Sequence, residues 1–247
     1  MIIKSAKQEK TYREAGRISS DILRELGNNV KVGVTPLEIE ELANDLCEEY
    51  GVKPSFKTVD DYDYATCISV NDCILHGIPN NIPFKDGDLV KVDFGIIYKG
   101  FFTDHCWTWG VGNISKEDRK LMEAGREAVE NGCTVAITNN HTGDISNQFR
   151  STAKKYGYTT LSDFAGHGIG KSLHENPDIY SFGDPGTGDK LKDGMVICIE
   201  CQVTKNDYIY IADNGWDVLS SYGEKGVMYE YMGIVRDHQF IKLTDSF

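Results

Sequence analysis

The chain has 247 residues, enough for one large domain or two fused half-domains around an apolar core. Its formal net charge of −12 and pI of about 4.9 argue against a nucleic-acid-binding or membrane-surface protein. We see no apolar run of transmembrane length and no signal-peptide pattern, and the seven cysteines have scattered spacings, so we expect a cytoplasmic protein without a disulfide framework.

Two helices are predicted near the start of the chain. Ser5 followed by Gln8 is a capping-box signature, and apolar residues then recur at helical spacing until Gly27. Thr35-Pro36-Leu37-Glu38 is a second capping signature with proline in the first turn, and Gly51 ends that helix.

The order of elements then repeats. Strands are expected from about residue 66 to 109, helices after Ser115 and from about Asp144 to Gly157, and strands from about 159 onward. Corresponding helix starts are separated by roughly 107–110 residues. We therefore predict a single α+β domain over residues 1–247, with pseudo-two-fold halves of about 1–110 and 111–247 and helices backing a curved antiparallel sheet.

Two acidic residues share one position in this repeat. KDGDLVKVDF contains Asp93 and KDGMVICIEC contains Glu200, each six residues after the glycine and near the end of an apolar strand pattern. Such short strings recur by chance, and either acid alone could be an edge charge. An ionised carboxylate in a buried strand is costly without a partner, so the shared offset favours one common site.

Two further acids extend this set. Lys99-Gly100 predicts a turn after which Asp104 returns opposite residue 93 or 95, on the face that carries Asp93. Glu230 lies inside the apolar run VMYEYMG. Facing carboxylates repel each other unless a cation lies between them, and four of them balance two divalent ions.

Histidines complete the candidate site. His167 and His174 lie in AGHGIGKSLHENP, where the glycines and proline predict a loop or bend. A histidine among glycines is usually a turn hydrogen-bonder, but beside orphan acids we interpret His167 as a metal ligand. His76, before a Gly-Ile-Pro turn, is either a surface or a site residue. Oxygen-rich ligands with one imidazole suit manganese, iron, cobalt or zinc, and a pair of such ions performs hydrolytic chemistry.

In this order and spacing, the residues resemble the type I methionine aminopeptidases of the pita-bread metallopeptidase fold. The resemblance covers nearly the whole chain, through the stretches REAGRI, PSFK, ISVND, HGIP, KDGD, VDFG, GHGIGKSLHENP, GMV, ADNGW and YE. It implies an aminopeptidase that removes initiator methionine from nascent polypeptides and peptides. It also implies a monomer that makes a transient contact with the ribosome. We expect neither the insertion that marks type II enzymes nor an N-terminal zinc-finger extension.

The resemblance also implies residue roles. Asp93 would hold one of two divalent ions and His167 with Glu200 the other, while Asp104 and Glu230 would bridge them. Glu200 would in addition shuttle the proton of the attacking water. His76 and His174 would contact the scissile amide and its tetrahedral intermediate. The residues that match the methionine pocket are Tyr62, Cys67, His76, Leu173 and Trp216.

Some positions depart from the family pattern and leave specificity open. Cys201 and Tyr231 replace the residues usual after two of the ligands, while Leu173 and Val59 replace aromatic pocket residues, so we expect a looser methionine pocket. The motif VDFG and the pair Thr103-Asp104 are more typical of the proline-specific peptidases of the same fold. The alternatives are an aminopeptidase for Xaa-Pro or short peptides, although such enzymes usually carry a large N-terminal domain, and a non-catalytic pita-bread binding module.

Overall fold

The first helix begins where its capping residue predicts. The computed structural model describes residues 1–245, and α1 spans Ala6–Asn28. The Ser5 hydroxyl accepts a hydrogen bond from the backbone N–H of Gln8, as expected for an N-cap. The Gln8 side chain, however, accepts from the backbone N–H of Lys4 at 2.8 Å rather than from Ser5, so only half of the predicted capping box forms.

Two of the other helices also start at predicted caps, whereas the last helix begins at Thr142, with His141 at its N-cap, rather than near Asp144. Thr35 and Glu38 form a complete capping box, and Ser115 forms another with Asp118. Gly157, in the left-handed conformation with φ of 82°, ends the last helix. These helices are α2 (Pro36–Glu49), α3 (Lys116–Val135) and α4 (Thr142–Tyr156).

Short strands and one single-turn 3-10 helix, η1 (Phe56–Thr58), make up the rest of the regular structure in residues 1–245. The strands are β1 (Lys53–Pro54), β2 (Thr66–Val70), β3 (Cys73–Leu75), β4 (Leu89–Phe94), β5 (Ile96–Tyr98), β6 (Phe101–Phe102), β7 (His105–Gly110), β8 (Thr159–Thr160), β9 (Ala165–Gly168), β10 (Glu175–Tyr180), β11 (Val196–Thr204), β12 (Ile209–Ile211), β13 (Val218–Ser220), β14 (Val227–Val235) and β15 (Phe240–Lys242). Two helices followed by strands thus occur twice along the chain.

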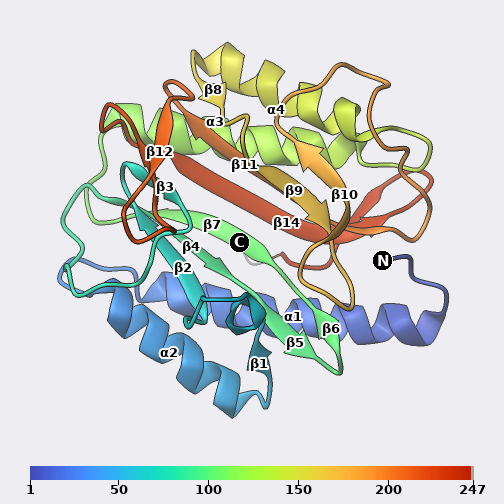
Figure 1. Ribbon diagram of the computed structural model, residues 1–247, viewed down its shortest axis with the longest axis horizontal. Helices are drawn as coiled ribbons and strands as arrows, with labels where there is room; N and C mark the ends of the chain where they lie inside the picture. Colours follow the sequence, from blue (N-terminus) through green and yellow to red (C-terminus); the bar gives the residue numbers. More distant parts are fainter. Residues whose placement is uncertain (246–247) are drawn as a thin grey trace.

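The strands lie between two pairs of helices. In Figure 1, α1 and α2 lie below the strands and α3 and α4 above them. The first half contributes the sheet β2-β4-β7 and the second half the sheet β10-β9-β11-β14-β15, in which β8 also pairs with β11; the neighbouring pairs in both are antiparallel. One apolar cluster packs α1 and α2 against β4, and another packs α3 and α4 against β11 and β14. These findings confirm the predicted α+β class.

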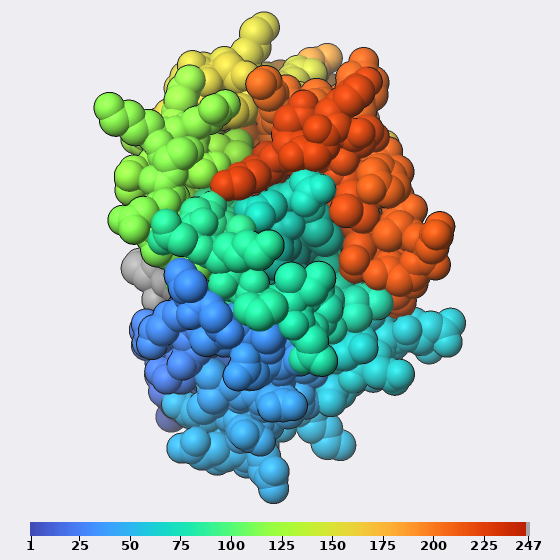
Figure 2. Space-filling view, turned by 90° about the vertical axis from the view of Figure 1, so that its left-hand side faces the viewer, coloured from blue at the N-terminus to red at the C-terminus, as the bar shows by residue number. Residues whose placement is uncertain are grey.

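Two of the contacts that connect the halves lie between strands. Between β7 and β14, the buried hydroxyl of Thr108 donates to the carbonyl oxygen of Met228 at 2.7 Å and accepts from its N–H at 3.0 Å. At the other junction, β13 pairs with β3 in the sheet β12-β13-β3. Figure 2 shows this side, where orange atoms of the second half lie against blue-green atoms of the first. The site described below lies where the halves meet.

None of the helices in residues 1–245 combines the length and the apolar character needed to cross a membrane.

Candidate active site

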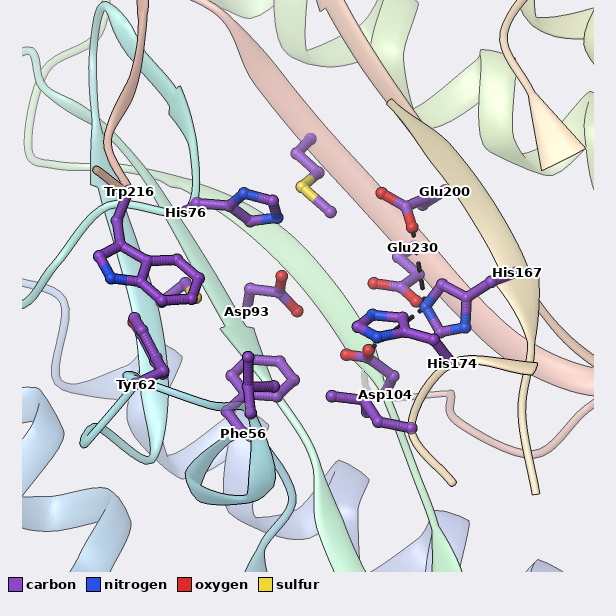
Figure 3. Close-up of a pocket in the computed structure, with 14 residues that line it drawn as sticks. Phe56, Tyr62, His76, Asp93, Asp104, His167, His174, Glu200, Trp216 and Glu230 are labelled. Carbon is purple, nitrogen blue, oxygen red and sulfur yellow. Dashed lines mark ion pairs between the residues drawn. The ribbon is translucent and has the colours of Figure 1, made fainter. Parts of the chain in front are cut away.

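A cavity of about 150 Å³ opens between the two halves, and every predicted site residue lines it. Figure 3 shows the charged groups and two histidines at one end and aromatic rings at the other. The lining comprises Phe56, Val59, Tyr62, Cys67, His76, Asp93, Asp104, His167, Leu173, His174, Glu200, Trp216, Met228 and Glu230. Phe56 and Met228 also line the cavity, although their sequence patterns predict no role for either.

Four buried carboxylates converge at the charged end. Asp93 lies in the fully buried strand β4, and Glu200 lies in β11 directly opposite Glu230 of β14. The ladder between β4 and β7 ends at the pair Phe94–His105, so Asp104 lies just beyond it and turns toward the same cavity. Oxygens of Asp93, Asp104 and Glu230 lie within 4.8 Å of one another. The predicted clustering of the acids on one face is therefore present.

The four buried carboxylates accept too few hydrogen bonds from the protein to satisfy all their oxygens. Among the described residues, Oδ1 of Asp93, Oδ1 of Asp104 and Oε1 of Glu230 have no hydrogen-bond partner. All four residues are at most 9% exposed. Buried ionised groups are normally paired or bind a metal, so the oxygens that remain free are suited to a cation.

Burial also changes the acidity of these groups when no cation is present. It raises the pKa of Glu200 to about 8 and that of Asp104 to about 7. The pKa of Asp93 and that of Glu230 are raised well above their usual range, first by burial and then by the negative charge of Asp104. The cluster would thus hold protons near neutral pH unless positive charge replaced them.

His167 presents one ring nitrogen to the acids. Its Nδ1 lies 2.9 Å from the backbone oxygen of Gly168, which can only accept, so Nδ1 carries the proton in the neutral ring. Nε2 is then free, 3.6 Å from Oδ2 of Asp104 and 4.0 Å from Oε1 of Glu200. A backbone carbonyl on the distal nitrogen is a common way to orient a histidine that binds a metal.

The predicted loop or bend is present between the two histidines, at residues 169–174, but it does not include His167. His167 lies in strand β9, which pairs with both β10 and β11. A Cβ on Gly166 would lie 2.5 Å from the carbonyl oxygen of Cys198, and one on Gly168 would lie 2.2 Å from that of Asn176. The glycines therefore permit close approach of neighbouring strands, which brings His167 beside Glu200.

The two other histidines border the acids. The ring centroids of His174 and His167 are 4.5 Å apart, and His76 lies across the cavity with its ring 5.5 Å from that of Phe164. Desolvation lowers the pKa of His174 to about 4, with smaller contributions from His167 and His76. Burial likewise lowers the pKa of His76. Both rings are therefore neutral at pH 7 and can each donate one hydrogen bond.

The opposite end of the cavity is apolar and aromatic. The rings of Tyr62 and Trp216 meet edge to face at 4.7 Å between centroids, and the Tyr62 hydroxyl is held by the backbone oxygen of Thr66 at 2.7 Å. Phe56, on η1, adds a further ring to this wall. This end could enclose a flexible apolar side chain, while the acids lie at the other end of the cavity.

Comparison with known proteins agrees with these features. Residues 10–237 match metallopeptidase family M24. The chain belongs to this family. It is 37% identical to a methionine aminopeptidase of Clostridium perfringens, with 93% of both chains covered, and 33% identical to methionine aminopeptidase 1 of Bacillus subtilis, with 99% of both covered. The M24 assignment confirms the predicted resemblance and implies an enzyme that uses divalent metal.

Solved M24-type structures share the fold. A methionine aminopeptidase of Thermotoga maritima superposes with a TM-score of 0.95 at 32% identity, covering 99% of this chain and 100% of that one. A prolidase of Pyrococcus horikoshii gives a TM-score of 0.81 at 22% identity and shows the shared pita-bread architecture alone. The predicted pita-bread fold is therefore confirmed.

Proposed function

We propose that this chain is a methionine aminopeptidase that removes the N-terminal, initiator methionine from nascent polypeptides and peptides. The observation that carries the proposal is the convergence of four underpaired buried carboxylates and His167 at one end of a cavity whose other end is aromatic. Relatives with this name match the chain over nearly its whole length.

Five residues would hold two divalent ions: Asp93, Asp104, His167, Glu200 and Glu230. Carboxylates and one imidazole suit manganese, iron, cobalt or zinc, and a charge of −4 suits two such ions. When bound, the ions would polarise the scissile carbonyl and lower the pKa of the attacking water. The unpartnered oxygens of the cluster support this assignment.

The remaining chemistry would come from the chain itself. Glu200, at the edge of the acid cluster, would accept the proton of the attacking water and pass it to the leaving amine. His174 and His76 would donate hydrogen bonds to the scissile amide, and more strongly to the oxyanion that develops from it. Their neutral state at pH 7 leaves them able to donate without adding positive charge to the site.

The apolar end would hold the methionine side chain. Tyr62, Cys67, Leu173 and Trp216 line it together with His76. A thioether is flexible and gains from contacts between sulfur and aromatic rings, so it suits a narrow aromatic slot.

We further propose that the protein is a cytoplasmic monomer that makes at most a transient ribosome contact. The seven cysteines are all free thiols, which suits a reducing compartment. Five of them lie in strands of the sheets.

One experiment tests the function. Met-Ala-Ser, Met-Leu-Ser and Ala-Pro-Phe peptides are incubated with protein that has been stripped by a chelator and reloaded separately with manganese, iron or cobalt. We expect cleavage of Met-Ala-Ser above the other two, and only after reloading. A preference for Ala-Pro-Phe would assign the chain to Xaa-Pro peptides, and no cleavage with any metal would favour the binding module.

A further inference from the structure

Glu200 has a neighbour in its strand that holds one of its oxygens. Nε2 of Gln202 donates a short hydrogen bond, 2.6 Å long, to Oε2 of Glu200. Both residues belong to β11, and a separation of two places their side chains on the same face. Gln202 does not line the cavity and is 0% exposed, so it acts on Glu200 from behind.

The other half of the Gln202 amide is unsatisfied. Its Oε1 has no hydrogen-bond partner among the described residues, although the side chain is completely buried. Such an orphan acceptor costs stability, and an apolar residue of similar shape would avoid that cost. Turning the amide over would place its oxygen against the Glu200 carboxylate, which cannot donate when ionised. The residue is therefore explained by the bond that it makes to Glu200, not by its packing.

This bond distinguishes the two oxygens of Glu200. Oε2 is held by Gln202, while Oε1 is the oxygen nearest His167, 4.0 Å from its Nε2. Rotation of the carboxylate would break the bond to the amide. The amide thus keeps one defined oxygen turned toward the acid cluster.

The internal repeat supports a specific role. At the repeat offset of 107 residues, Glu200 corresponds to Asp93 and Gln202 to Gly95, which has no side chain. Within residues 1–245, Oδ1 of Asp93 accordingly has no hydrogen-bond partner, and no side-chain amide holds it in place. Of the two corresponding acids, the one oriented by an amide is the one to which the proposed function gives the proton transfer.

We propose that Gln202 is a positioning residue of the hydrolytic site, which fixes the orientation of the Glu200 carboxylate for metal binding and for accepting the proton of water. The inference rests on the proposed function of the same site. The backbone on either side is held independently, since Gln202 pairs with Met228 across the sheet and its carbonyl accepts from the N–H of Leu161 at 3.2 Å.

The test replaces the amide while keeping the shape. Gln202→Met removes the N–H donor and keeps an unbranched side chain of similar size. Gln202→Asn keeps the amide but moves it away from Glu200, because the side chain is shorter by one methylene. We expect kcat on Met-Ala-Ser to fall by about 10–100-fold, with KM changed less than about twofold, because partners behind metal ligands have effects of that size. We also expect Co²⁺ affinity measured by calorimetry to fall about tenfold and the visible spectrum of the Co²⁺-loaded protein to change.

Thr204→Val is the matched control. Thr204 lies on the same face of β11, is 1% exposed and donates through its hydroxyl to the carbonyl of Asn206, away from Glu200. It should lower the melting temperature while leaving kcat and the Co²⁺ spectrum unchanged. Unchanged kcat, affinity and spectrum in both Gln202 variants would overturn the proposal, as would equal losses in Thr204→Val. If the wild-type protein cleaves no peptide, the proposed function fails, and the affinity and spectrum still decide the role of Gln202.

Discussion

Glu200 and Glu230 occupy directly opposed positions on β11 and β14, so two buried carboxylates face each other across neighbouring strands. Like charges placed in this way destabilise a sheet unless something neutralises them. The sheet is therefore destabilised at the position where the proposed chemistry takes place.

Glu230→Gln should stabilise the metal-free protein and abolish its response to metal. In the folded metal-free protein Glu230 must either hold a proton or keep an uncompensated charge, and either state costs stability above the pKa of an unfolded carboxyl group, so a neutral amide of similar shape should raise the melting temperature. Wild-type protein should instead gain stability on loading, by about 2.7 kcal/mol when free metal is a hundredfold above Kd. Thermal unfolding with and without Mn²⁺ measures both effects. Glu123→Gln, on the exposed surface of α3, is the control, and equal metal responses in both variants would contradict the prediction.

The metal-free protein should lose stability as the pH rises. Burial raises the pKa of Asp104 to about 7 and that of Glu200 to about 8, while unfolded carboxyl groups titrate near pH 4. The folded state therefore binds more protons than the unfolded state in this interval. The stability contributed by the protonated acids is complete below about pH 4 and is lost as the pH rises through about 7–8.

Calorimetric melting temperatures of chelator-treated protein from pH 5 to 9 measure this trend. Saturating Mn²⁺ should raise the melting temperature most at the high end, because metal and protons compete for the same oxygens. A metal-free melting temperature that is constant or rises over this range would show that the acids are ionised without cost.

His174→Ala should lower kcat by about 10²–10³-fold, the usual effect of losing one donor to an oxyanion. KM should change little, because the bond strengthens only as the transition state forms. Steady-state kinetics on Met-Ala-Ser separate the two parameters. His238→Ala, at an exposed position, should leave both unchanged. A rise in KM at constant kcat would make His174 a uniform binding contact instead.

Methionine should be preferred at the cleaved position. Leucine and norleucine should be rejected less strictly than by family members that carry aromatic residues at the positions of Val59 and Leu173. Leu173 and Val59 both line the cavity, but Phe56 contributes a ring on the same wall, which limits the loosening. One methylene in such a pocket discriminates by about 1–3 kcal/mol. The ratio of kcat/KM for Met-Ala and Leu-Ala peptides measures the preference, with small second residues favoured.

Trp216→Leu should reduce that ratio. Each contact between sulfur and an aromatic ring contributes about 0.3–1.5 kcal/mol, which corresponds to a loss of about 2–12-fold for methionine relative to leucine. Tyr210→Leu is the control, because Tyr210 lies in the same hairpin but is 52% exposed and does not line the cavity. An unchanged ratio in Trp216→Leu would exclude the indole from the methionine pocket.

Local sequence rules predicted the parts of the molecule that local interactions determine. The capping pair Thr35–Glu38 and the serine Ser115 correctly mark helix starts, because the bonds of a capping box span only three residues. The lysine–glycine pair Lys99-Gly100 forms the predicted turn, with both residues at positive φ. The equal offset of Asp93 and Glu200 placed both acids on buried strands, since one turn-and-strand pattern was used twice.

Features set by packing were missed. Phe56 reaches the cavity from a single 3-10 turn, which has no periodicity that could indicate its direction. The glycines and proline around His167 predicted a loop or bend, which is present at residues 169–174, but the strand that holds His167 itself was missed, because its glycines serve the close approach of β10 and β11. Met228 and Gln202 could have been found, because each lies two residues from a predicted ligand and therefore on its face of the strand.

The hydroxyl junction at Thr108 has a consequence for the order of events during folding. Asp93 and Asp104 lie on the β4–β7 side of this junction, and His167, Glu200 and Glu230 lie on the β9–β11–β14 side. A growing chain that has completed only its first helices and strands therefore contains two of the five proposed metal ligands. It cannot yet assemble the proposed hydrolytic site. On the proposed function, peptidase activity therefore requires that the strands of the second half have docked against those of the first.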